Sequence, residues 1–138
     1  MTNLDALLIL NAVSGIGPVR ARSLIEYFGS AEKVLLASHE DLLAVADIAE
    51  HTALNILHFS KDKFLLDEYN LGQCAGVRLM TMVDEDFPPL LKEIPGAPNV
   101  LYIKGHADVL SMPCIAMVGS RICSHYGKAT AQGFAGAF

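Results

Sequence analysis

Three consecutive residues near the end of the chain, Gly119, Ser120 and Arg121, have the chemistry of an anion-binding loop. The glycine lets the backbone approach a ligand closely, and the serine hydroxyl can donate a hydrogen bond. The arginine guanidinium favours a phosphate electrostatically and can hold it with two hydrogen bonds. Gly127, in the loop that follows, and Lys128, in the first turn of the expected helix, complete this predicted phosphate-binding site. A tight structural turn is the alternative interpretation.

The elements around this loop indicate an α/β fold. The apolar run Cys114–Val118 predicts a buried strand, because it is continuous rather than alternating. An Ala-rich helical pattern follows the loop, and its N-terminus would offer free N–H groups to an anion. A parallel sheet needs several strands and long crossovers. The chain stops inside the helix at Phe138, so we expect the fold to be incomplete in this sequence.

A second glycine motif, Gly15-Ile16-Gly17, lies near the N-terminus and is followed by Arg20. Two glycines around an apolar residue, before a helix with the small residue Ala21, are typical of a helix-hairpin-helix. The turn of such a hairpin directs backbone N–H groups at a nucleic-acid phosphate without reading base sequence. Gly15, Ile16, Gly17 and Arg20 therefore form a second candidate DNA contact. A purely structural role for the hairpin is equally consistent with the sequence.

The hairpin sequence occurs twice. Val13–Ile25 and Val45–Leu57 align without gaps at an offset of 32 residues, which predicts two helix–turn–helix units of one design. In the second copy Asp47 and Ala49 replace the glycines, and Glu50 replaces Pro18. A carboxylate at the turn would repel phosphate, so this copy is predicted to be structural.

Residues 1–75 are predicted to form short helices. Thr2 with Asp5, and Ser38 with Asp41, have the spacing of capping boxes. Pro18 suits the first turn of a helix over 19–28, and Gly29 suits its left-handed end.

A longer helix is expected from about Ser60 to Cys74, with Phe64, Leu65 and Leu71 on its buried face and Gly76 closing it. Short strands are expected over 77–82 and 100–103. A domain boundary near residues 72–76 divides the chain into a helical module (1–75) and an incomplete α/β domain (76–138).

Composition and charge exclude several classes of protein. The chain has 138 residues, 52% of them hydrophobic, and contains no apolar run long enough to span a membrane. Three cysteines without a C-x-x-C pair favour a reducing, cytoplasmic location and argue against a zinc site. The net charge of −5 arises from residues 31–76, which carry eight acids and three bases, while no acid follows Asp108. No metal, cofactor or catalytic residue is predicted.

With these residues laid out, the chain resembles the N-terminal portion of the DNA-processing protein A family (DprA, also called Smf) over its whole length. The resemblance includes the helical hairpin module, the connector DEDFPPLLKEIPGAPNVLYIKG (84–105) and the sequence IAMVGSR (115–121) with the later Tyr126-Gly127. The connector and the GSR signature together are fairly specific. The chain departs from the family at residues 122–125, where a threonine or proline is common.

The resemblance implies a helix-hairpin-helix (SAM-like) module followed by a Rossmann-like domain with an extended, mostly parallel sheet. It also implies a non-enzymatic protein of natural transformation that binds and protects single-stranded DNA, forms a homodimer and loads RecA recombinase. Two alternatives remain open. One is a nucleotide-hydrolysing enzyme of the lysine-decarboxylase-like type, which also has a Rossmann-like fold. The other is a helical protein-interaction module that uses its acidic middle segment.

Overall fold

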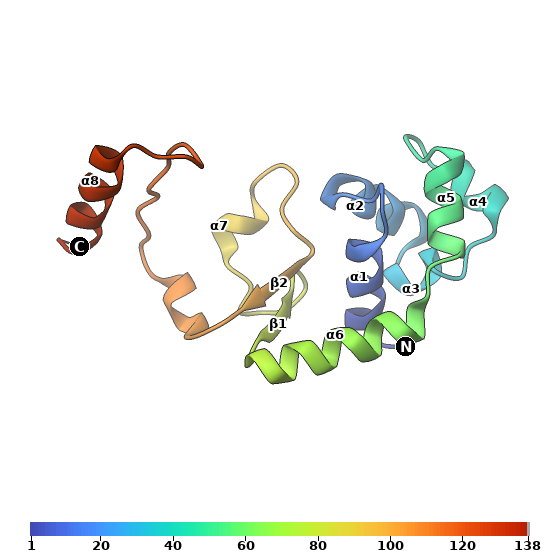
Figure 1. Ribbon diagram of the computed structural model, residues 1–138. Helices are drawn as coiled ribbons and strands as arrows, with labels where there is room; N and C mark the ends of the chain where they lie inside the picture. Colours follow the sequence, from blue (N-terminus) through green and yellow to red (C-terminus); the bar gives the residue numbers. More distant parts are fainter. Residues whose placement is uncertain (138) are drawn as a thin grey trace.

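The computed structural model describes residues 1–137; Phe138 lies outside the described residues. Helices dominate the N-terminal half, and two short strands follow (Figure 1). The elements, in chain order, are α1 (Asn3–Ala12), α2 (Pro18–Phe28), α3 (Ala31–Val34), α4 (His39–Leu43), α5 (Glu50–Leu57), α6 (Lys61–Ala75), β1 (Arg78–Thr81), α7 (Pro89–Lys92), β2 (Val100–Ile103), the 3-10 helix η1 (Ala107–Ser111) and α8 (His125–Ala135).

The predicted helix ends are confirmed. The Thr2 hydroxyl accepts a hydrogen bond from the Asp5 N–H at 3.2 Å, and the Asp5 carboxylate accepts one from the Thr2 N–H at 2.6 Å. Ser38 forms the same capping box with the third residue of α4. Gly29 and Gly76 end α2 and α6 with left-handed φ values of 87° and 63°. Glycine adopts this conformation at little cost, so both ends follow from local sequence.

The predicted internal repeat is confirmed by the backbone. Gly15 and Asp47, 32 residues apart, both have positive φ, at 89° and 64°. The next residue closes the turn in the same way in both copies. The Ile16 N–H donates a hydrogen bond of 3.1 Å to the Val13 carbonyl, and the Ile48 N–H donates one of 3.3 Å to the Val45 carbonyl. The next residue in each copy, Gly17 or Ala49, is an extended N-cap that begins α2 or α5. Asp is among the few non-glycine residues that tolerate left-handed backbone, which allows the second turn to keep its shape.

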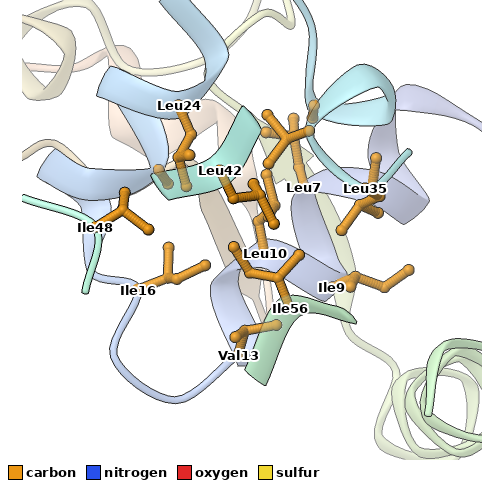
Figure 2. Packing of buried hydrophobic residues seen from close by; sticks show 14 of the residues in the cluster. Leu7, Ile9, Leu10, Val13, Ile16, Leu24, Leu35, Leu42, Ile48 and Ile56 are labelled. Atoms are coloured by element: carbon orange, nitrogen blue, oxygen red, sulfur yellow. The ribbon is translucent and has the colours of Figure 1, made fainter. Parts of the chain in front are cut away.

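One hydrophobic core joins the two copies (Figure 2). Five consecutive residues of α1, Ala6 to Leu10, are buried, so this helix lies at the centre of the module. Helices α2 to α5 contribute further buried side chains, including Leu24 from α2, Leu42 from α4 and Ile56 from α5. Leu24 and Ile56 occupy equivalent positions of the two copies, and both are about 99% or more buried. The repeat therefore works as one packing unit rather than as two separate hairpins.

Helix α6 only partly follows the prediction. Phe64 and Leu65 pack against the core, and Phe64 makes an edge contact with Phe59 at a ring-centroid distance of 5.2 Å. The prediction that Leu71 is buried is wrong, because its side chain is 67% exposed. The C-terminal end of α6 continues past α1 toward β1 and β2 (Figure 1).

A hydrogen bond of 2.6 Å from the Tyr69 hydroxyl to Asp5 ties α6 to the start of α1. Burial by itself would raise the pKa of Asp5, but the hydrogen bonds from Tyr69 and Thr2 outweigh it and lower that pKa. Burial and the same bond raise the pKa of Tyr69 to about 12. Because the pKa of Asp5 is lowered on folding, its stabilising contribution is present above the unfolded pKa and is lost as the pH falls through the folded one.

We expect Tyr69→Phe to lower the free energy of unfolding at neutral pH by about 0.5–1 kcal/mol, since the bond is partly exposed. The variant should also lose less stability than the wild type below about pH 4 and between about pH 10 and 12. Denaturant unfolding across this pH range measures both effects. Tyr126→Phe, at an exposed tyrosine of α8, is the control. Parallel pH profiles for wild type and Tyr69→Phe would contradict the assignment.

The two strands pair antiparallel, with Arg78 opposite Ile103 and Thr81 opposite Val100. Both lie within or at the positions predicted from the sequence. The third predicted strand, Cys114–Val118, is wrong: the run has no strand conformation, and Val118 is 93% exposed. A strand needs a neighbour to satisfy its N–H and C=O groups, and residues 1–137 offer it none. The expected parallel sheet is therefore not formed in the described residues.

The two parts of the chain are in contact. The end of α6 coincides with the predicted boundary, but Val100 of β2 belongs to the helical core and Leu79 of β1 packs against it. The hairpin of β1 and β2 is thus attached to the helical module. The segment after β2 runs away from this body and ends in α8 (Figure 1).

Candidate nucleic-acid interface

The loop predicted to bind phosphate lies directly before α8. Ser124 caps this helix, because its hydroxyl accepts a hydrogen bond from the Gly127 N–H at 3.1 Å. The helix therefore begins at His125. The prediction that Gly127 lies in the loop is wrong, because this residue lies in the first turn of α8. The missed signal was a serine three residues before Gly127, which is a common N-cap arrangement.

The loop and the first two turns of α8 line an open hollow of about 660 Å³. Four of the five predicted residues line it: Gly119, Ser120, Gly127 and Lys128. The structure therefore brings together residues from both sides of the loop. Arg121 is not among the lining residues, and its side chain is exposed beside the hollow. The apolar neighbours Val118 and Ile122 were not predicted to contribute.

The charge at this loop is positive. No carboxylate follows Asp108 in the sequence, whereas Arg121 and Lys128 lie on or next to the hollow. The N-terminus of α8 adds the partial positive charge of the helix dipole. No group of three or more His, Cys, Asp or Glu residues that could hold a metal ion is found among residues 1–137. The arrangement suits an anion rather than a cation.

The first helical hairpin forms a separate candidate contact, in the part of the molecule that holds α1 and α2 (Figure 1). Ile16 is 93% buried, so only its backbone can reach a ligand. The Arg20 guanidinium donates a hydrogen bond of 2.8 Å to the Gly15 carbonyl at the turn. Gly17 faces open space, because a Cβ added there would meet no atom within 4 Å.

The second copy of the repeat supports the turn of the first. The Asn55 amide donates a hydrogen bond of 3.0 Å to the Ser14 carbonyl. A Cβ on Gly15 would lie 3.1 Å from the hydroxyl of Thr52, which is almost fully buried. Close approach as well as positive φ therefore requires glycine at position 15. Sequence reasoning missed both α5 residues, since no motif marks them.

Two family models match the chain. The model of the DNA recombination-mediator protein A family matches residues 78–138, and the model of the SAM-like helix-hairpin-helix tandem matches residues 7–62. DNA processing protein DprA of Streptococcus pneumoniae is 29% identical over 121 residues, which cover 86% of this chain and 40% of that protein. The chain is thus similar to the DNA-processing protein A family over most of its length. It spans less than half the length of this relative.

Shorter matches concern another group of proteins. UvrABC system protein C of Rhizobium etli is 43% identical over 54 residues, which cover 38% of this chain and 8% of that protein. The protein of the same name from Thermotoga petrophila is 50% identical over 42 residues, or 30% of this chain and 8% of that protein. No solved structure matches the chain. No helix within residues 1–137 is long and apolar enough to cross a membrane.

Proposed function

We propose that this protein binds single-stranded DNA through its phosphates, without catalysing a reaction. The observation that carries the proposal is the hollow at the start of α8, where Gly119, Ser120, Gly127 and Lys128 meet in a segment matched by the DNA recombination-mediator family. Glycine backbone, a hydroxyl and a helix N-terminus are donors that suit phosphate oxygens. Arg121 is exposed next to these residues and extends the site toward a neighbouring phosphate.

We further propose that residues 76–138 begin a Rossmann-like domain. The support is the order of an apolar run, a GSR loop and a capped helix, which is the order expected at a phosphate-binding crossover. Similarity to the DNA-processing protein A family supports a role in natural transformation, with protection of incoming DNA, homodimer formation and transfer of the strand to RecA recombinase. The three exposed, unpaired cysteines are consistent with a cytoplasmic location.

A salt titration tests the phosphate-based part of the proposal. For single strands, log K is expected to fall with log [salt] by about 0.7 for each phosphate that is neutralised. If Arg121 and Lys128 each contact one phosphate, they alone contribute a slope of roughly −1.4. Fluorescence anisotropy of a labelled oligothymidine strand measures the slope, and an oligoadenosine strand checks that base sequence matters little. An affinity that does not change with salt would refute the proposal.

The first hairpin is proposed as a weaker contact to the same strand. Gly17 offers a clean probe, because its φ of −92° and its open surroundings accept a side chain. Asp and Asn are both good N-caps, so Gly17→Asp and Gly17→Asn should preserve or increase stability. A carboxylate at a helix N-terminus competes with a phosphate there. We therefore expect Gly17→Asp to bind DNA about two- to fivefold more weakly than Gly17→Asn.

Anisotropy titrations of the two Gly17 variants, with thermal melts as the stability control, measure this difference. Equal DNA affinity for the two variants would show that the hairpin is only structural. A loss larger than that caused by Arg121→Ala would reverse the order of the two contacts.

A further inference from the structure

The outer surface of the second hairpin combines carboxylates with exposed leucines. Along 39–58 every third or fourth side chain is buried in the core, for example Leu42, Ile48 and Ile56. The residues between them face outward. We define the acidic face by six of these outward residues: Glu40 and Leu43 of α4, Asp47 of the turn, and Glu50, Leu54 and Leu57 of α5.

The spacing of these residues produces a continuous stripe on α5. Glu50, Leu54 and Leu57 lie at positions i, i+4 and i+7, which share one side of a helix. Leu43, Leu54 and Leu57 are 40%, 38% and 36% exposed. Helices α4 and α5 are in contact, so the stripe on α5 lies close to α4.

The charge on this face has no internal counterpart. No lysine or arginine occurs over 34–60, whereas 39–58 contain four carboxylates. Both ion pairs found in residues 1–137, Lys63–Asp67 and Arg78–Asp86, lie elsewhere. Asp41 is the one acid of the four that a capping box occupies, through its hydrogen bonds with Ser38. Glu40, Asp47 and Glu50 are therefore left to attract a cation from outside the chain.

The partner must satisfy both features of the face. Three unpaired carboxylates repel nucleic acid and anionic lipid, but they attract lysine and arginine. The leucines between them favour a partner that also buries apolar side chains, as an amphipathic helix does when it docks on a hydrophobic surface. Charge complementarity thus selects a basic partner, and the leucine stripe selects an amphipathic one.

We propose that the acidic face is a docking surface for a basic amphipathic helix of another protein. The face lies at the end of the molecule opposite α8, so a partner bound there leaves the loop 119–124 open (Figure 1). The proposal goes beyond the DNA-binding function and does not depend on it, because different residues carry it.

The probe is a synthetic peptide of about 18 residues, or five helical turns, with leucine at helical spacing and lysine elsewhere. Its control is a scrambled peptide of identical composition, in which the leucines do not share one side. Isothermal titration calorimetry measures the affinity of each peptide. We expect the patterned peptide to bind at least about tenfold more tightly than the scrambled one.

Substitutions locate the binding site. Glu50→Gln combined with Leu54→Ser should raise the Kd of the patterned peptide at least about tenfold. The matched control combines Glu85→Gln with Leu66→Ser, which removes one exposed carboxylate and one exposed leucine outside the face. It should change the Kd less than about twofold. All four side chains are exposed, and circular dichroism melts check that both variants stay folded.

Three results would overturn the proposal. The first is equal affinity of the scrambled and the patterned peptide. The second is loss of binding by the control variant, and the third is binding of the patterned peptide only at millimolar concentration or above. Any one of these results refutes docking on the acidic face. None of them bears on the binding of single-stranded DNA, which is measured separately.

Discussion

Leu24→Ala and Ile56→Ala should each lower the free energy of unfolding by about 2–5 kcal/mol. Both side chains are almost completely buried in the core shared by the two hairpin copies. Alanine removes apolar contacts and leaves a cavity that the neighbouring helices only partly fill. Because small domains are stable by roughly 5–15 kcal/mol, either change should remove a large part of the total.

Denaturant unfolding followed by circular dichroism measures these losses. Leu66→Ala, at a leucine of α6 that is largely exposed, is the matched control and should have little effect. The equivalence of positions 24 and 56 adds a stricter expectation, namely that the two buried changes have losses of similar size. If Leu24→Ala were as mild as Leu66→Ala, the description of one shared core would be wrong.

The features that could be predicted from the sequence depend mainly on neighbouring residues. Capping boxes at Thr2 and Ser38, the glycine ends at Gly29 and Gly76, and the repeat of the hairpin are confirmed. Each of these is determined by side chains within a few positions, or by two aligned copies of one pattern. The strand over 100–103 was also predicted with its observed bounds.

The errors concern features that depend on distant parts of the chain. The Cys114–Val118 run has the composition of a buried strand, but a strand forms only where a neighbour accepts its hydrogen bonds. Leu71 has the right helical spacing for burial, yet α6 extends beyond the core at that point. The contacts of Thr52 and Asn55 with the first turn could not be predicted, because they link residues about 40 positions apart.

The candidate phosphate site shows the same division. Its residue types were predicted from the loop sequence, and four of the five line one hollow. The start of α8 at His125, and with it the place of Gly127 inside the helix, depended on the Ser124 cap. Arg121 does not line the hollow, although Ser120 and Ile122 on either side of it do. Its role is therefore the part of the site that most needs a direct measurement.

Replacing Arg121 by alanine should weaken the binding of single-stranded DNA roughly ten- to a hundredfold. The change removes a hydrogen-bonded ion contact with phosphate, for which about 1.5–3 kcal/mol is expected. Arg121→Lys should recover only part of the affinity, because an ammonium group keeps the charge but lacks the planar fork that holds two oxygens. The side chain is exposed, so neither change should affect folding.

Lys104→Ala separates a specific contact from an effect of net charge. This lysine is also exposed and lies just after β2, away from the loop, so its loss changes the total charge by the same amount. We expect Lys104→Ala to bind DNA within about twofold of the wild type and to leave the salt dependence unchanged. Arg121→Ala should instead make the slope of log K against log [salt] less steep by about 0.7, the value for one phosphate contact on a single strand. Equal affinity and equal slope for wild type and Arg121→Ala would show that the loop before α8 is a structural turn, and that the DNA contact must be sought elsewhere in the protein.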